Sequence, residues 1–223
     1  MQEAHQVLPT LVPGDAIGNE VIEIRKVLRK WGYVSEVYAE NIHPTYARMA
    51  KSHRKLDDIS QEAVLIYHYS IGSDLTRIVR RLQNRLCIVY HGITPYEYYI
   101  GVNETLARLL RKGLDELPSL RERTAIALGD SEFDRQELIQ MGFQNTAVLP
   151  ILLDFCRYDT PPSHEMVRRY DDDSVNILFV GRYSSNKRLE DLIKVFGYYQ
   201  KCINDNSRPV SYTHLRAHET VLD

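Results

Sequence analysis

The sequence predicts an α/β protein: a Rossmann-like domain with a parallel sheet, followed by the first β-α unit of a second Rossmann-like domain. Short apolar runs alternate with longer segments of helical periodicity along most of the 223 residues. The run at residues 63–67 is apolar throughout, which is typical of a strand that is buried on both faces. Repeated alternation of this kind indicates a parallel sheet that helices cover on both faces.

In chain order, the apolar runs predict strands in the first domain over residues 6–11, 35–39, 63–67, 86–90, 124–128 and 146–149. A first helix is predicted to begin at the N-cap Asn19 and to end at Gly32, because Val21, Ile24 and Leu28 recur at helical spacing. Further helices are expected between later strands, over residues 76–82, 103–117 and 132–141.

The regular alternation stops at residues 154–173, which contain two adjacent prolines and the acidic run 171–173. We interpret this stretch as a linker between a first domain at residues 1–153 and a second domain at residues 174–210. The second domain has one predicted strand (175–180) and one predicted helix (189–202). That is too little chain to bury a core of its own.

Residues 211–223 do not continue the pattern, because two histidines, an arginine and a glutamate stand where another buried strand is expected. His214 and His218 lie four residues apart beside Glu219, which imitates a helical zinc pair, but no third ligand is apparent. We therefore predict no metal site. We interpret the segment as an artefactual tail, translated from sequencing-adapter DNA and fused to a truncated reading frame.

The composition argues against several classes of function. The 28 basic and 30 acidic residues give a net charge of −2, so a nucleic-acid-binding protein is not expected. No apolar run approaches the roughly 20 residues of a membrane-spanning helix, and the N-terminus does not resemble a signal peptide. Three separated cysteines indicate a cytoplasmic protein. Peripheral contact with the inner membrane face stays open, although the best basic cluster is more typical of a solvated helix face: Arg108, Arg111 and Lys112.

Ligand sites of open α/β sheets lie beyond the carboxyl ends of the strands, so the loops after the strands are the candidates. The first such loop contains Gly14 and Gly18 ahead of a helix, where backbone N–H groups and the helix dipole favour a phosphate. A tight turn is an equally good interpretation of this glycine pair. The loop matches neither the GxGxxG nor the P-loop pattern, which disfavours a NAD-linked oxidoreductase.

Two further strands are predicted to end in Tyr-His, at His68 and at His91, and hydroxyl-bearing and aromatic residues follow each. Such side chains can stack on sugar rings and hydrogen-bond their hydroxyls. A single histidine is more often structural, but two at equivalent strand ends favour a site. In the loop after the next strand, Asp130 or Ser131 is predicted to cap a helix or, with equal weight, to contact a ligand.

The loop after the strand of the second domain is the most informative. There Gly181 is followed by Arg182 and, five residues on, by Lys187, at the start of a helix. An arginine can hold two phosphate oxygens in a fork and a lysine adds a point charge, so the two could neutralise a diphosphate without a metal. The alternative is an ordinary solvated basic loop.

This segment resembles the donor-binding loop of a known family. The residues Val180-Gly181-Arg182, then Asn186-Lys187 and residues 189–193 (Leu-Glu-Asp-Leu-Ile), resemble the loop that opens the second domain of GT-B glycosyltransferases of the retaining family 4 type. The resemblance extends over residues 1–209. It implies transfer of a sugar from a nucleotide-sugar donor to a glycan, lipid-linked or small acceptor, with retention and with neither a cofactor nor a metal.

The resemblance also implies roles for single residues. Arg182 and Lys187, with Gly181, would hold the donor diphosphate, and His91 would be the catalytic residue that faces the transferred sugar through its backbone carbonyl or its ring. The remaining residues carried over would line the cleft or contact the acceptor or the sugar: Gly14, Gly18, His68, Tyr96 and Ser131. A glutamate pair that binds the donor in this family would lie beyond Asp223, so we expect an incomplete and inactive fragment of a hexosyltransferase.

Two other functions are consistent with the sequence. A nucleotide-sugar epimerase shares the two-domain architecture, and it would need carboxylates in its cleft as acid and base, for which Glu97 is the obvious candidate. A noncatalytic α/β module that binds an anion or a partner protein is the other alternative.

Overall fold

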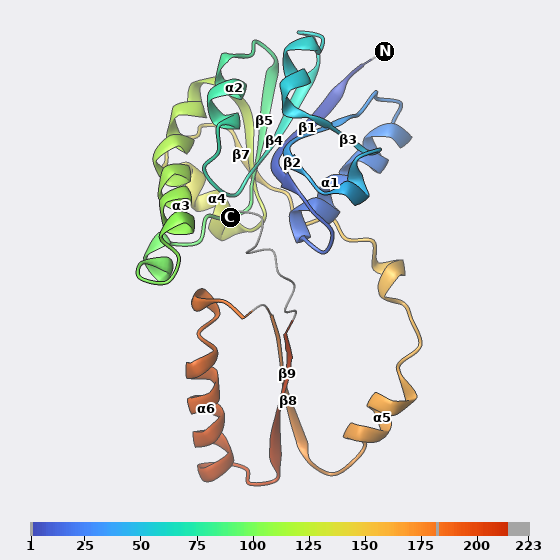
Figure 1. Ribbon diagram of the computed structural model, residues 1–223, viewed down its shortest axis with the longest axis vertical. Coiled ribbons are helices and arrows are strands. Elements are labelled where there is room, and N and C mark those ends of the chain that lie inside the picture. The colour runs from blue at the N-terminus through green and yellow to red at the C-terminus, as the bar shows by residue number, and fades with distance from the viewer. Residues whose placement is uncertain (1, 182, 214–223) are drawn as a thin grey trace. The chain divides into compact units, whose positions relative to one another are not determined.

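The computed structural model describes residues 2–181 and 183–213 (Figure 1). The chain divides into two compact units, Met1–Cys156 and Arg157–Asp223, which we call unit 1 and unit 2. No helix of the described residues is long and apolar enough to cross a membrane.

Unit 1 is built on a parallel sheet of seven strands in the order β3-β2-β1-β4-β5-β6-β7. The strands are β1 (Ala4–Leu11), β2 (Val37–Ile42), β3 (Ala50–Ser52), β4 (Val64–Tyr69), β5 (Arg85–Tyr90), β6 (Thr124–Gly129) and β7 (Thr146–Val148). The strand order reverses between β1 and β4, because β1 connects to β2 on one side and β4 connects to β5 on the other. The predicted fold class, a Rossmann-like parallel sheet flanked by helices, is confirmed.

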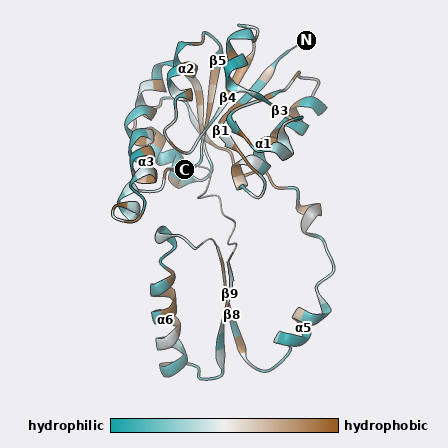
Figure 2. Cartoon of the chain, viewed as in Figure 1, coloured by the Kyte–Doolittle hydropathy of each residue, from teal (hydrophilic) through white to brown (hydrophobic). Residues whose placement is uncertain are grey.

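Helices connect these strands and cover the sheet. The α-helices of unit 1 are α1 (Ala16–Lys30), α2 (Leu75–Arg81), α3 (Glu104–Glu116) and α4 (Glu132–Gln140). Short 3₁₀ helices are η1 (Pro44–Tyr46), η2 (His53–Asp58), η3 (Tyr96–Tyr99), η4 (Leu117–Arg123) and η5 (Phe155–Tyr158). Figure 2 shows that apolar residues gather in the strands of this unit.

Two apolar clusters hold the helices on the sheet. The larger one packs side chains of β4 and β5, such as Tyr67 and Ile88, against Leu75 of α2 and Leu110 of α3. The smaller one joins β1 and β2 to Val21 of α1. Burial of this apolar surface stabilises the unit and fixes the positions of the loops at the carboxyl ends of the strands.

The structure corrects the predicted start of the first helix. Asp15, not Asn19, is the N-cap of α1: its backbone is extended, and its side chain accepts a hydrogen bond from the Gly18 N–H at 3.1 Å. Gly18 therefore lies in the first turn of the helix rather than in the loop. A Cβ there would lie 3.2 Å from the Val12 carbonyl oxygen. Gly14 occupies the turn itself with a φ of 80°, a conformation that favours glycine.

The two Tyr-His pairs do not occupy equivalent strand ends. β4 continues through His68 to Tyr69, which pairs with Tyr90 at the end of β5, so His68 lies inside its strand and His91 follows its own. The extra residues stay in β4 because Tyr69 is fully buried and its hydroxyl donates to the Gly113 carbonyl at 2.8 Å. Because His68 lies within β4 and His91 follows β5, the two imidazoles face one another and do not both project into a loop.

Unit 2 is a strand–helix–strand unit. It comprises α5 (His164–Tyr170), β8 (Val175–Gly181), η6 (Ser185–Lys187), α6 (Leu189–Cys202) and β9 (Ser207–Thr213), with β8 and β9 paired in parallel. The alternation predicts a strand after α6, but no residues were assigned to it. β9 occupies that place, and its last three residues (211–213) belong to the segment interpreted as a tail. Several apolar side chains of unit 2 are exposed, for example Leu178 (62% exposed) and Ile193 (67% exposed). Residues 214–223, which include His214 and His218, lie outside the described residues, and the predicted origin of the tail remains a prediction.

Candidate functional site

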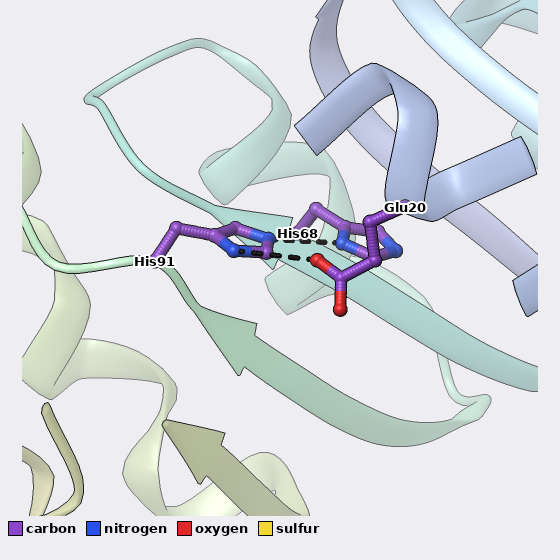
Figure 3. Close-up of side chains that lie close together, drawn as sticks. All are labelled: Glu20, His68 and His91. Atoms are coloured by element: carbon purple, nitrogen blue, oxygen red, sulfur yellow. Dashed lines mark hydrogen bonds and ion pairs between the residues drawn. The ribbon is translucent and has the colours of Figure 1, made fainter. Parts of the chain in front are cut away.

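A cluster of buried polar side chains lies at the carboxyl ends of the central strands, where the strand order reverses (Figure 3). Glu20 comes from α1 after β1, His68 from the end of β4, His91 from the residue after β5 and Asp130 from the residue after β6. We call these four residues the Glu-His-His-Asp cluster. The reversal point of an open α/β sheet is the usual position of a ligand site.

Local structure explains why these side chains converge. Glu20 falls on the buried face of α1 together with Val21 and Ile24, as their helical spacing requires. The Asp130 N–H donates to the Tyr90 carbonyl at 3.3 Å, which holds the turn after β6 against the end of β5.

A chain of hydrogen bonds fixes the protons of both imidazoles. The amide nitrogen of Gln6 donates to the Val21 carbonyl at 2.9 Å, so its Oε1 must face His68 Nε2, 3.0 Å away. Since Oε1 can only accept, His68 carries its proton on Nε2 and leaves Nδ1 as an acceptor. His91 Nε2 lies 3.0 Å from that Nδ1 and therefore donates to it.

The other ring nitrogen of His91 faces the two carboxyl groups. His91 Nδ1 lies 2.9 Å from Asp130 Oδ2 and 3.7 Å from Glu20 Oε2. Glu20 Oε1 accepts a hydrogen bond from the Leu152 N–H at 3.4 Å. The second oxygens, Glu20 Oε2 and Asp130 Oδ1, are buried without a hydrogen-bond partner among the described residues.

Burial shifts the protonation of the cluster. The Glu20 side chain is fully buried, and desolvation raises its pKa from 4.5 to about 7, with a further increase from the charge of Asp130 and a decrease from His91. Desolvation likewise holds the pKa of His68 well below its usual range, and His91 adds to this effect. His68 is therefore neutral, as the hydrogen bonds also require.

Three of these groups are close enough to share a metal ion. One ligand atom each from Glu20, His68 and His91 lie within 4.8 Å of one another. However, all four imidazole nitrogens already have protein partners at 2.9–3.0 Å, and a metal would have to break the bond between the two rings. The geometry is that of a hydrogen-bonded network, and the sequence-based expectation of no metal stays a prediction.

The structure places the predicted residues of unit 1 in two groups. Gly14 and Gly18 lie at the start of the helix that carries Glu20, and His68 and His91 belong to the cluster itself, with the His91 side chain only 3% exposed. Two other candidates lie outside the cluster. The Tyr96 ring lies under the guanidinium of Arg111, 5.6 Å away, and Ser131 caps α4 by accepting from the Asp134 N–H at 3.3 Å.

The predicted diphosphate site belongs to unit 2. Gly181 is the last residue of β8, and Lys187 is an exposed residue at the end of η6. Arg182 lies outside the described residues. Whether Arg182 and Lys187 act together therefore remains a prediction.

Sequence reasoning missed Gln6 and Glu20 as members of the site and left Asp130 undecided. Both omissions had a signal in the sequence. Gln6 is polar inside an apolar strand run, and Glu20 stands between Ile17 and Ile24 at helical spacing on an apolar face. A polar residue at such a position needs a buried partner, and each of these two has one.

Comparison with known proteins identifies the fold. No family model matches the sequence, and no curated protein matches it. A trehalose-6-phosphate protein from E. coli, solved with UDP-2-fluoro glucose, aligns over 94% of this chain and 64% of its own, with a TM-score of 0.59 and 11% identity. Sucrose-phosphate synthase from Thermosynechococcus elongatus aligns over 94% and 70%, with a TM-score of 0.54 and 11% identity. An alpha-glucosyltransferase, solved with UDP and a 13-mer DNA, aligns over 95% and 56%, with a TM-score of 0.50 and 12% identity.

These similarities define the class of fold. The structural neighbours are GT-B proteins, so the chain has the GT-B type of α/β architecture. It spans between 56% and 70% of the length of the three neighbours described above.

Proposed function

We propose that this chain is part of a glycosyltransferase that moves a sugar from a nucleotide-sugar donor to an acceptor. The observation that carries the proposal is the Glu-His-His-Asp cluster at the reversal point of a GT-B sheet. The names of the neighbours, which include a glucosyltransferase and proteins solved with UDP or a UDP sugar, support it. Membership of family 4, retention, a hexosyl donor and a glycan, lipid-linked or small acceptor are finer parts of the same proposal.

The geometry suggests how His91 would serve such a reaction. Both of its ring nitrogens are used inside the protein, toward His68 and Asp130, so the ring is not available to a substrate. The backbone of His91 and Gly92 is the part that would face the transferred sugar. A fixed backbone dipole costs no reorganisation when charge develops on the sugar.

In unit 2, Arg182 and Lys187 would hold the diphosphate of the donor and support the charge of the departing nucleotide. This assignment rests on the sequence motif and on the exposure of Lys187. Cations near a leaving phosphate act where charge develops, which is where electrostatic catalysis is most effective.

A direct test uses nucleotide binding and turnover. The full chain is titrated with UDP in a calorimeter, and UDP-, ADP- and GDP-linked hexoses are assayed for release of nucleoside diphosphate. We expect saturable UDP binding that Lys187→Ala weakens by roughly tenfold. Lys194→Ala is the matched control, since Lys194 is an exposed lysine on α6. The chain is expected to lack turnover as an incomplete fragment, so the deciding result is binding: absence of saturable UDP binding would contradict the proposal.

A nucleotide-sugar epimerase is the second candidate, and one observation favours it. Glu97, the predicted acid or base, lies exposed in η3, but Glu20 and Asp130 supply two carboxyl groups beside an imidazole. Isomerisation of the nucleotide sugar without release of nucleoside diphosphate would select this function.

A further inference from the structure

One buried oxygen of the cluster has no explanation in the hydrogen-bond network. Glu20 is fully buried, and its Oε2 has no hydrogen-bond partner among the described residues. An ionised carboxylate in that position would keep an unmet acceptor and an uncompensated charge in the protein interior, which is costly. We propose that Glu20 is a positioning residue for His91 that acts in its neutral, protonated form.

Proton counting supports a neutral Glu20. His68 fixes a proton on His91 Nε2, so the bond between His91 Nδ1 and Asp130 Oδ2 contains one further proton. Whichever of these two atoms holds that proton, the His91–Asp130 pair carries no net charge. An ionised Glu20 would therefore give the cluster a charge of −1, whereas a protonated Glu20 leaves it neutral.

The arrangement around His91 Nδ1 also fits a proton on Glu20, because Asp130 Oδ2 at 2.9 Å and Glu20 Oε2 at 3.7 Å both face this one nitrogen. A carboxyl group with its proton on Oε2 becomes a hydrogen-bond donor there, while Oε1 still accepts from the Leu152 N–H. Conversion of one acceptor into a donor removes the excess of acceptors around His91 Nδ1.

The groups that face Glu20 come from three other segments of the chain. They are His91 after β5, Asp130 after β6 and the backbone N–H of Leu152 after β7, and His68 of β4 lies behind His91. Burial raises the pKa of Glu20 to about 7, in the same direction as the geometric argument. Loss of the proton would place a second negative charge beside Asp130 and draw His91 Nδ1 away from Oδ2.

The first experiment needs no substrate, so it stands even if the proposed function fails. The full chain is labelled with ¹⁵N-histidine, and the ring signals of His68 and His91 are assigned with His68→Gln and His91→Gln. We expect both rings to change between pH 6 and pH 8.5 in the parent protein. In Glu20→Gln, which keeps the size and neutrality of the acid, they should stay at the parent's pH 6 positions throughout. Glu23→Gln, on the same helix, is the control and should titrate as the parent does.

Two outcomes would overturn the proposal. One is a Glu20→Gln protein that does not fold or whose imidazole signals differ from the parent's at pH 6, because a neutral side chain would then be insufficient. The other is a parent spectrum without the infrared C=O band of a buried carboxylic acid at pH 6, compared with Glu20→Gln.

The consequence for catalysis rests on the proposed function. If the unsubstituted chain turns over a nucleotide sugar, its kcat should fall at least threefold from pH 6.5 to pH 8.5, and Glu20→Gln should abolish this dependence of kcat on pH. A kcat that falls equally in both proteins would overturn the positioning role, while the histidine spectra would still report the protonation of Glu20. If the unsubstituted chain neither binds UDP nor turns over a nucleotide sugar, the proposed function fails, and the histidine spectra still decide the protonation of Glu20.

Discussion

The buried acid of the cluster makes the stability of unit 1 depend on pH, and the size of the effect follows from the pKa of Glu20. That pKa is raised from 4.5 to about 7 in the folded protein. The folded state therefore holds a proton that the unfolded state releases between these values. The proton on Glu20 contributes its full stabilisation below pH 4.5. This stabilisation falls as the pH rises through 7, and above that pH it is absent.

The shift of about 2.5 units corresponds to a ceiling of about 3 kcal/mol. A measurement between pH 5 and pH 8 covers only part of the interval over which the two states differ in protonation, so we expect about 2 kcal/mol. Urea unfolding at pH 5 and pH 8, followed by the fluorescence of the single tryptophan Trp31 in unit 1, measures the change. Relative to Glu20→Gln, the parent should lose about 2 kcal/mol between the two pH values.

The comparison between the two proteins cancels the titration of groups that do not interact with Glu20. A difference in unfolding free energy that does not change with pH would refute the reasoning. So would a parent that gains stability over Glu20→Gln as the pH rises, since that is the behaviour of an ionised glutamate stabilised by His91.

Three further predictions concern packing and the network. Gly72→Ala would bring a Cβ within 2.6 Å of the Gly113 backbone nitrogen, so it should lower the unfolding free energy by about 2 kcal/mol, whereas Gly197→Ala, with nothing within 4 Å, should not lower it. Urea unfolding distinguishes the two. His68→Leu leaves both hydrogen-bond partners of the ring buried and unpaired, and should cost about 2–3 kcal/mol in the same measurement. Dialysis against a chelator should leave the thermal midpoint unchanged, and a fall of several degrees would favour a metal in the cluster.

The sequence predicted six of the seven strands of the sheet, because β–α alternation is a local pattern with a strong tertiary consequence. The edge strand β3 was not predicted, since its three residues are too short a run to give a periodic signal. The runs at residues 63–67 and 86–90 predicted the central strands β4 and β5 to within two residues. Helix starts were less certain, because Asp15 and Asn19 are both good caps, and packing of Gly18 close to the Val12 carbonyl agrees with the earlier one.

The site was only partly predictable for a different reason. His91 and His68 were found from their place at strand ends, but their partners depend on the register between strands. A two-residue extension of β4 decides that the two imidazoles meet at 3.0 Å. Nothing local to either Tyr-His pair contains that information. Glu20 did have a local signal, its position on the apolar face of α1, but its partners His91 and Asp130 come from distant strands.

The hydrogen bond between Leu152 and Glu20 joins residues 132 positions apart. This contact has a large sequence separation. The cluster is therefore complete only after nearly all of unit 1 has been synthesised and β7 has joined the sheet. Until that bond forms and Glu20 is buried, its carboxyl group stays hydrated, with a pKa near 4.5, and is ionised at neutral pH. Uptake of a proton at that residue would then mark the final step of maturation, which a pulse-labelled refolding experiment could time.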